Sequence, residues 1–300
     1  MKTKNYCNLT VIVPAYNEEN GLKESIPSLI SGVPGAEVIV VNDGSTDQTK
    51  DVIKEFPNVQ YVQHSFNQGQ GASLRTGMML ASREWVAWFD ADNEHRVEDL
   101  QQIYELAQSQ NLVAVIGQRS TPSASITRAL GKWVIRLIGK SLKIKAGTDL
   151  NCGLRIFRKK VITNYLQLIP NRFSSSLVTT LIILERGFPM KFHPVKTNAR
   201  VGNSTVRLKD GFEAILQLIR SVLLFAPMRF FLPTGMIIFM LGVCYSLFIA
   251  YNFHNGLPVA GMFAMLSGLL VVALGLVADQ ISQIRLTGLA SRHPYIDEDE

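Results

Sequence analysis

EWVAWFDADNEH, residues 84–95, joins an apolar, aromatic-rich run to three carboxylates at alternating positions, Asp90, Asp92 and Glu94. The run Glu84–Phe89 is typical of a strand buried on both faces of a sheet. A buried strand that ends in acids delivers them to the rim of the sheet, where open α/β sheets bind their ligands. Hard oxygen ligands at this spacing suit Mg²⁺ or Mn²⁺ shared with substrate phosphates, so the stretch predicts a metal site.

A plainer interpretation of the same acids is a turn that caps the helix expected to begin near Val97. Two aspartates separated by one residue are common by chance, so the motif alone is weak. Its position at the end of a Trp- and Phe-rich strand favours the metal site, and the rest of the chain has to support it.

Short strands and helices alternate on both sides of this stretch. The expected strands are Leu9–Val13, Glu37–Val41, Val59–Gln63, Glu84–Phe89 and Leu112–Gly117, with helices between them that end near Phe56 and Ala81 or begin near Val97. This alternation predicts an α/β fold with a mostly parallel sheet and right-handed crossovers.

Turn residues follow the first strands. We expect Pro14 to end the first strand and Asn17 to cap the helix that follows it. After the second strand, Gly44 permits a sharp turn, and Ser45 or Thr46 is the expected cap of the next helix. Helix N-termini that follow such turns are sites for phosphate, and several of them around one carboxylate pair suggest a nucleotide diphosphate bound through a metal.

Further elements are expected beyond residue 120. Ser125–Lys140 is a basic, apolar helix, which suits either the membrane interface or an ordinary amphipathic core position. Ser174–Arg186 is an expected helix, and Met190–Pro194 is an expected edge strand.

A charge-free region lies near the C-terminus. The apolar fraction of the chain is 47%, and no Asp, Glu, Lys or Arg occurs between Arg229 and Asp279. Residues 230–251 and 257–278 each span about 33 Å as helix, enough to cross a hydrocarbon core of about 30 Å. The polar turn Asn252–Gly256 joins them, so the sequence predicts a transmembrane hairpin rather than two buried core helices.

The basic residues predict an orientation for this hairpin. Arg220 and Arg229 precede the first span, Arg285 and Arg292 follow the second, and the connecting loop has no Lys or Arg. The positive-inside rule then places both termini and the N-terminal domain in the cytoplasm. No signal peptide is visible, and three scattered cysteines fit a reducing compartment.

The expected organisation is a catalytic domain over 1–209, a juxtamembrane amphipathic helix over 210–229, the hairpin over 230–279 and a cytoplasmic tail over 280–300. The net charge of +6 suits contact with anionic lipid headgroups. It does not indicate nucleic-acid binding, because no basic stripe is interleaved with aromatic residues.

Four motifs in register carry a family resemblance. VIVPAYNEE (11–19), VNDGSTD (41–47), NQGQGA (67–72) and DAD (90–92) resemble, in order and spacing, the family 2 glycosyltransferases with a GT-A fold. The resemblance covers roughly residues 9–209, and the hairpin fits the membrane-anchored subgroup. It implies a Rossmann-like GT-A domain.

The resemblance also implies the donor site. The Pro-Ala-Tyr-Asn-Glu loop and the Asp of Asp-Gly-Ser hold the base and ribose in that family, and Asp90 and Asp92 would hold Mg²⁺ or Mn²⁺ on the diphosphate. Glu94 stands where related members have Gln, and is the expected third metal ligand. Gln70 stands at an often basic position, so one phosphate contact is either missing or supplied by Arg75. The implied donor-binding residues are Pro14, Ala15, Tyr16, Asn17, Glu18, Asp43, Gly69, Arg75 and Ala91.

Other segments resemble acceptor sites. Residues 148–158 resemble the family's Asp-x-x-x-Gly-Phe segment, and 200–207 resemble the Arg-x-x-Gly-x-Ser-Lys loop of the dolichyl-phosphate mannose synthase type. Thr205 stands where that loop usually has Lys, and Arg207 is a candidate replacement. The resemblance implies that Arg119, Arg128 and Arg200 bind the phosphate of a polyprenyl phosphate acceptor.

The resemblance implies an inverting transfer of one sugar from a nucleotide sugar to a polyprenyl phosphate. A phosphate acceptor is anionic near neutral pH, its second pKa being about 6, so the attack needs no strong base. It needs a cation on the leaving diphosphate and arginines that hold the nucleophile by bidentate contacts. The expected catalytic residues are Asp90, Asp92 and Asp149, the last to orient sugar or acceptor.

Two other functions stay open at this point. One is a GT-A enzyme with a hydroxyl acceptor, such as a diacylglycerol, a protein or a glycan, for which Asp149 is the one candidate base. The other is a non-catalytic membrane adaptor that binds a nucleotide sugar, against which the acidic triplet argues. The sequence does not separate GDP-mannose from a UDP-hexose.

Further expectations concern the glycines of the hairpin, His95 and Cys152. Gly235, Gly242 and Gly268 leave room for close helix approach, which makes a homo-oligomer plausible. His95 lies close enough to the acids in the sequence to touch the site, but is interpreted as a surface histidine at a helix N-terminus, and Cys152 is interpreted as a packing residue.

Overall fold

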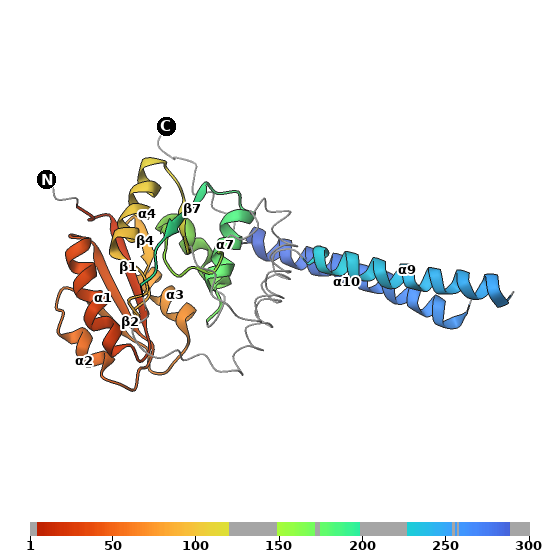
Figure 1. The fold of residues 1–300 in the computed structure, drawn as a ribbon, viewed down its shortest axis with the longest axis horizontal. Coiled ribbons are helices and arrows are strands. Elements are labelled where there is room, and N and C mark those ends of the chain that lie inside the picture. Colours follow the sequence, from red (N-terminus) through yellow and green to blue (C-terminus); the bar gives the residue numbers. More distant parts are fainter. Residues whose placement is uncertain are drawn as a thin grey trace. The chain divides into compact units, whose positions relative to one another are not determined.

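The structure, a computed structural model of the chain, describes residues 5–119, 149–171, 175–198, 227–253, 256 and 258–288. The chain divides into two compact units (Figure 1): an α/β unit that holds the described residues up to 198, and a helical hairpin that holds those from 227 onward. The expected helix Ser125–Lys140, the loop 200–207 and most of the juxtamembrane helix lie outside the described residues. The expected domain boundaries therefore stay predictions.

Strands and helices alternate through the first part of the α/β unit, as expected. The elements are β1 (Leu9–Ala15), α1 (Glu19–Gly32), β2 (Glu37–Asn42), α2 (Thr49–Lys54), β3 (Gln60–Gln63), α3 (Gln70–Leu80), β4 (Trp85–Trp88), α4 (Val97–Ser109) and β5 (Ala114–Arg119). After a gap in the described residues come β6 (Arg155–Arg158), α6 (Lys159–Ile162), the 3-10 helix η1 (Thr163–Leu168), α7 (Ser175–Glu185) and β7 (Met190–Val195).

These strands form one sheet of seven strands in the order β3-β2-β1-β4-β6-β5-β7. All neighbours pair in parallel except β6, which runs antiparallel to both β4 and β5. The mostly parallel α/β fold is therefore confirmed, and β7 is the edge strand that the sequence predicted. The sequence did not predict β6, because the four residues Arg155–Arg158 carry a charge at each end and lack the apolar run of a central strand.

The core shows why a central strand must be apolar on both faces. All seven residues of β1 are buried. Val11 and Val13 belong to the main apolar cluster with Leu22 and Ile26 of α1, while Ile12 lies against Gly77 of α3 on the opposite face. Alternate side chains thus point to opposite faces, and each face is covered by a helix.

Pro14 does not end the first strand, contrary to expectation. It lies within β1 and pairs with Val41 of β2. The carbonyl of Ile12 accepts a hydrogen bond from Phe89, on the β4 side, whereas that of Ala15 accepts one from Asp43, on the β2 side. Backbone groups alternate in this way along a strand, so the nitrogen of Pro14 faces the β4 side. No ladder bond is lost there, because pairing with β4 ends at Ile12.

The expected helix caps are also wrong. No side chain caps α1, and Asn17 adopts a positive φ of 55° with its side-chain oxygen accepting a hydrogen bond from the Thr46 amide. Helix α2 begins at Thr49, which is further along the chain than a helix capped by Ser45 or Thr46 would begin. These polar residues bind one another across the two turns instead, because the parallel strands bring the turns together. Gly44 adopts a φ of 71°, as its place in the sharp turn requires.

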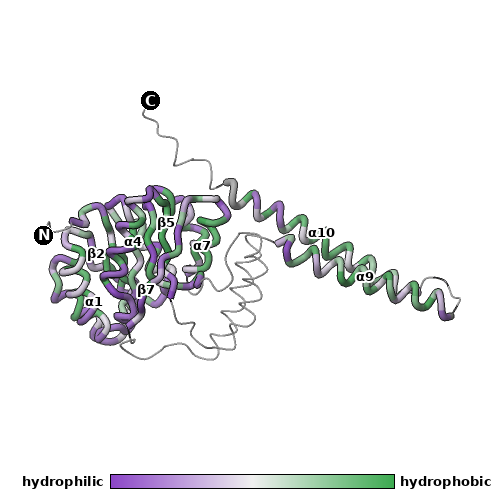
Figure 2. The backbone as a smooth tube through the Cα atoms, turned by 45° about the horizontal axis from the view of Figure 1, so that its top comes forward, coloured by the Kyte–Doolittle hydropathy of each residue, from purple (hydrophilic) through white to green (hydrophobic). Residues whose placement is uncertain are grey.

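The second unit is a hairpin of two long apolar helices, α9 (Met228–Phe253) and α10 (Val259–Gly288). Met228–Asn252 and Val259–Ile284 are long and apolar enough to cross a membrane, with mean hydropathies of 2.0 and 2.3. Figure 2 shows apolar residues predominating along both helices. Large apolar side chains such as Leu241 and Phe248 are exposed, which suits a lipid surrounding.

The small residues of this hairpin bring its own two helices together. A Cβ at Gly235 would lie 2.7 Å from the carbonyl oxygen of Gly268, and one at Gly242 would lie 2.8 Å from that of Gly261. Gly235, Gly242 and Gly268 thus serve close approach within one chain, and contacts between subunits stay a prediction.

Glu37, a partly exposed residue at the start of β2, offers a test of the polar contacts at this end of the sheet. Its carboxylate accepts hydrogen bonds from the Thr10 hydroxyl and from the amide and hydroxyl of Ser82, at 2.8 and 2.9 Å for the latter two. Burial raises the pKa of Glu37, but these bonds and the charge of Arg83 outweigh it and hold the pKa below its ordinary value of 4.5. Because the folded pKa is depressed, the stability from this carboxylate is present above pH 4.5 and is lost as pH falls below it.

We therefore expect Glu37→Gln to lower the free energy of unfolding by about 0.5 kcal/mol near pH 7, since an amide replaces an ionised acceptor whose contacts are partly screened by solvent. The difference from wild type should shrink as the pH falls below about 4. Thermal unfolding of the detergent-solubilised chain, followed by tryptophan fluorescence, measures it. Glu185→Gln, at an exposed residue that ends α7, is the control. A difference that stays constant across this pH range would contradict the prediction.

Candidate active site

The candidate site lies where the parallel strands end. Asn17 follows β1, Asp43 follows β2, and Asp90 follows β4 after one residue, Phe89. Because β1, β2 and β4 are parallel neighbours, their carboxyl ends share one edge of the sheet. The sheet therefore brings together turns that lie far apart in the sequence.

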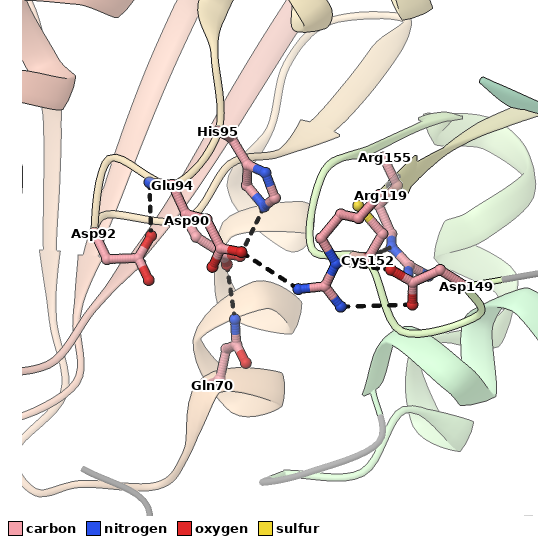
Figure 3. Close-up of polar contacts among 9 residues, drawn as sticks. All are labelled: Gln70, Asp90, Asp92, Glu94, His95, Arg119, Asp149, Cys152 and Arg155. Carbon is pink, nitrogen blue, oxygen red and sulfur yellow. Dashed lines mark hydrogen bonds and ion pairs between the residues drawn. The ribbon is translucent and has the colours of Figure 1, made fainter. Parts of the chain in front are cut away.

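Asp90 is held at both of its oxygens (Figure 3). Gln70 Nε2 donates to Oδ1 at 2.9 Å, and His95 Nε2 lies 2.9 Å from Oδ2. Burial raises the pKa of the Asp90 carboxyl, but the hydrogen bond and charge of His95, with the charges of Arg119 and Arg155, outweigh it and hold the pKa below its usual range. Asp90 is therefore ionised near neutral pH, as a metal ligand must be.

Asp92 and Glu94 follow on the same turn. Asp92 is buried, and its Oδ1 accepts a hydrogen bond from the Glu94 amide at 3.1 Å. Glu94 Oε1 lies 3.5 Å from Arg119 Nη1. Among the described residues, no group of three His, Cys, Asp or Glu side chains is already gathered as a metal site. The donor set of carboxylate oxygens nevertheless fits a hard divalent cation in its chemistry.

Arg119 joins the acidic turn to Asp149. Its Nε donates to Asp149 Oδ2 at 2.7 Å, while its Nη1 faces Glu94. Burial lowers the pKa of the Arg119 guanidinium, but the hydrogen bond and charge of Asp149 outweigh it and raise the pKa above its ordinary value. The structure thus brings together three residues that the sequence singled out separately. Arg128 and Arg200, the other expected phosphate ligands, lie outside the described residues.

Arg155 is a charged neighbour of the site that the sequence did not indicate. Its guanidinium is fully buried and donates to the carbonyls of Cys152 and Ser176 and to the hydroxyls of Thr179 and Thr180. It also lies 5.3 Å from the centre of a Trp88 ring. Burial lowers its pKa to about 10, so the group stays charged at neutral pH. Nothing in the local pattern marks it, because three of its four hydrogen-bond partners, Ser176, Thr179 and Thr180, come from the distant helix α7.

The first two turns are bound to each other. The Asn17 amide donates to Ser45 Oγ at 3.0 Å, and the Glu18 amide donates to Thr49 Oγ1 at 3.0 Å. Pro14 and Ala15 form the end of β1, and Tyr16 is half-buried beside them. The structure therefore places the expected donor-binding loop against the turn after β2, and the contacts of this loop with a nucleotide stay predictions.

Asp43 secures the turn at the start of α3. Its buried carboxylate accepts hydrogen bonds from the amides of Gln68, at 3.0 Å, and Gly69, at 2.7 Å. His64 Nδ1 lies 2.7 Å from the same carboxylate, and its Nε2 lies 2.9 Å from Thr76 Oγ1. Gly69 adopts a φ of 100° at this point. Asp43 thus has a structural role in this turn, while its expected contact with base or ribose stays a prediction.

Arg75 is directed elsewhere than expected. It donates to the carbonyl of Ile169 and to the side chain of Asn171, at the end of η1. The residue that reaches the acidic turn from α3 is Gln70. Ala91 is buried, and a Cβ at Gly21 would lie 2.4 Å from its carbonyl oxygen, so α1 packs directly on the acidic turn.

The interpretation of His95 as a surface histidine is wrong. Its side chain is 1% exposed, its ring packs edge-on against Phe89, and it contacts Asp90. The sequence placed it before a helix, which is correct, but the turn folds it inward because its backbone forms a bridge with Thr197. Cys152 is buried, as expected of a packing residue.

Comparison with known proteins agrees with the fold of both units. Residues 10–166 match the family model of glycosyl transferase family 2, and residues 226–284 match that of the GtrB C-terminal hairpin. The chain is 29% identical to a dolichyl-phosphate beta-glucosyltransferase of Trichomonas vaginalis, over 51% of this chain and 53% of that protein. It is 28% identical to an undecaprenyl-phosphate 4-deoxy-4-formamido-L-arabinose transferase of Pectobacterium atrosepticum, over 53% of this chain and 51% of that protein. The chain thus spans about half the length of these two relatives.

A solved structure shares the fold. Glucosyl-3-phosphoglycerate synthase from Mycobacterium tuberculosis, in complex with Mn²⁺, uridine diphosphate and phosphoglyceric acid, superposes with a TM-score of 0.60 at 17% identity. The match covers 72% of this chain and 77% of that one.

Proposed function

The chain belongs to glycosyl transferase family 2, and from that membership we propose that it transfers one sugar from a nucleotide sugar to a polyprenyl phosphate at a membrane surface. The observation that carries this proposal is the position of Arg119 between Glu94 of the acidic turn and Asp149. A guanidinium beside the carboxylates suits a reaction in which two phosphate-bearing substrates meet. The relatives named for dolichyl-phosphate and undecaprenyl-phosphate sugar transfer support the same acceptor class.

The donor binds at the acidic turn in this proposal. Asp90, Asp92 and Glu94 would hold a divalent cation, which when bound neutralises negative charge on the leaving diphosphate. The Mn²⁺ complex of the structural neighbour supports a divalent cation in this fold. Asp90 is suited to this role because it is ionised and its position is set by Gln70 and His95.

The acceptor phosphate binds at Arg119 in this proposal. An oxygen of the lipid phosphate attacks the anomeric carbon as the bond from that carbon to the diphosphate breaks, with inversion at the carbon. No general base is required, because the phosphate is already ionised near neutral pH. The chain's contribution is to hold the two anions in line and to offset their repulsion.

The contacts of Asp149 argue against a hydroxyl acceptor. Its two oxygens accept hydrogen bonds from the Arg119 guanidinium and from the Asn151 amide. A carboxylate whose oxygens are both engaged in this way is poorly placed to accept a proton from a sugar or glycerol hydroxyl. Asp149 therefore acts in this proposal as the residue that orients Arg119.

We also propose that the α/β unit lies on the cytoplasmic side of the membrane. The GtrB-type hairpin supports membrane association. Arginines flank both ends of the hairpin, and its connecting turn has no Lys or Arg. By the positive-inside rule, this supports a cytoplasmic position of the α/β unit.

For the proposed function, the first prediction concerns the reaction. Detergent-solubilised protein should transfer label from one of a panel of GDP- and UDP-sugars to undecaprenyl or dolichyl phosphate, and EDTA should abolish the transfer. Asp92→Asn should lower the rate by about 10²-fold or more, because a neutral amide is a weak cation ligand. Asp51→Asn, at a side chain that is 76% exposed, is the control and should not change the rate. Transfer to hydroxyl lipids alone would contradict the proposed acceptor.

The second prediction concerns Arg119. Arg119→Lys should raise the KM for the lipid phosphate about tenfold and leave the KM for the nucleotide sugar within twofold, since a lysine loses the bidentate contact. Steady-state kinetics with each substrate varied in turn measures both constants. Arg158→Lys is the matched control, because Arg158 also forms an ion pair, with Glu84. An equal rise in both KM values would show that Arg119 does not act on the acceptor in particular.

The third prediction concerns orientation. Cys7 is exposed on the α/β unit, Cys152 is buried, and Cys244 lies within the membrane-crossing part of α9. A membrane-impermeant maleimide should therefore label the chain in permeabilised cells and not in intact ones, and Cys7→Ser should abolish the labelling. Labelling of Cys7 in intact cells would place the α/β unit on the opposite side.

A further inference from the structure

His95 is a buried polar side chain whose position is not explained by packing alone. The residue as a whole is 2% exposed, and Nε2 lies 2.9 Å from Asp90 Oδ2. Its other ring nitrogen, Nδ1, is buried and has no hydrogen-bond partner among the described residues. Burying an imidazole with one unsatisfied nitrogen costs free energy, so the hydrogen bond that its other nitrogen makes calls for a reason.

The backbone holds this imidazole against Asp90. The residue forms a bridge with Thr197, and the neighbouring Glu94 carbonyl accepts a hydrogen bond from the Asn198 amide at 2.9 Å. The ring also packs edge-on against Phe89, with the ring centres 6.0 Å apart. The segment that follows β7 therefore anchors the turn, and the imidazole is fixed before any ligand binds.

The backbone at Gly153 lies against both Asp90 and His95. A Cβ at that position would lie 2.0 Å from Asp90 Oδ2 and 2.9 Å from His95 Nε2. The segment before β6 can approach the pair this closely only because residue 153 has no side chain. Oδ2 is thus enclosed by His95 and by the backbone at Gly153.

The second oxygen of Asp90 has a different surrounding. Oδ1 accepts from Gln70, whose side chain lies on the exposed start of α3. The two oxygens of one carboxylate are therefore divided between an enclosed contact and an accessible one. This division suits a carboxylate that offers one oxygen to a cation and is kept from rotating by the other.

We propose that His95 is a positioning residue for the cation carboxylate Asp90: it binds Oδ2 and thereby holds Oδ1 toward the ion. This inference rests on the cation role assigned to Asp90 in the proposed function. His95 does not touch either substrate in it. Its effect is on the affinity for the cation, and contacts of this kind with a ligating carboxylate change metal affinity by about 10–100-fold.

A merely structural role for His95 makes a different prediction. If the imidazole served only to fill the core, replacing it would lower thermal stability and leave cation affinity unchanged in the folded fraction. Cation affinity and thermal stability must therefore be measured on the same variants.

The experiment compares three substitutions in the detergent-solubilised full chain. Glutamine places an amide donor near the position of Nε2, asparagine places it about one methylene short, and leucine removes it. Binding of Mn²⁺ is measured by loss of the free-ion electron paramagnetic resonance signal, in the presence of UDP or GDP. Asp90→Asn is the reference for loss of the ligand, and His193→Gln, at a partly exposed histidine that contacts Gln102, is the control.

We expect His95→Leu and His95→Asn to weaken Mn²⁺ binding about 10–100-fold, and His95→Gln to stay within about threefold of wild type. If the leucine variant does not fold, the comparison of asparagine with glutamine still decides, because the two differ by one methylene. Equal affinities of the asparagine and glutamine variants, both close to wild type, would overturn the positioning role. Failure of the wild type itself to bind Mn²⁺ would instead overturn the cation assignment on which the role depends.

Discussion

The hydrogen bond between His95 Nε2 and Asp90 Oδ2 joins a buried imidazole to a carboxylate whose ionisation is opposed by burial. The positive charges of Arg119 and Arg155 also favour the ionised form of Asp90. Interactions of this kind are stronger in a low-dielectric surrounding than in water, and each unpaired group there costs more. The acidic turn can therefore exist only as part of a wider set of charges, and that set includes groups from strands β5 and β6 that lie far from Asp90 in the sequence.

The parallel sheet is what makes such a set possible. Strands β1, β2 and β4 end at one edge, and side chains of one turn satisfy the backbone of the next. Asn17 binds the turn after β2, and Asp43 binds the turn that leads into α3. The polar residues of the first two turns are used between turns, and neither α1 nor α2 has a side-chain cap. In the proposed function, turns that are ordered in advance help to hold a flexible diphosphate.

Much of the fold could be predicted because its signals are local. The apolar run before Asp90, the alternation of strands and helices and the charge-free hairpin all depend on residues close together in the chain, and each was confirmed. Strand β6 escaped prediction because the burial of Arg155 depends on carbonyls and hydroxyls of α7. The expected helix caps failed for the same reason. Asn17 could cap the helix that follows it or bind the distant turn after β2. The sequence does not show which of these backbone groups will lie within hydrogen-bond distance.

The sequence by itself determined the fold class, the acidic turn at the end of β4 and the apolar hairpin, because hydrophobic periodicity and the order of polar turns specify them. Only the tertiary structure decided which polar groups meet. It turned His95 inward to Asp90, paired Arg119 with Asp149 and directed Arg75 away from the acids. The physical reason is that a hydrogen bond or ion pair requires atoms within about 3 Å of each other, and distances between remote segments exist only once the chain has folded.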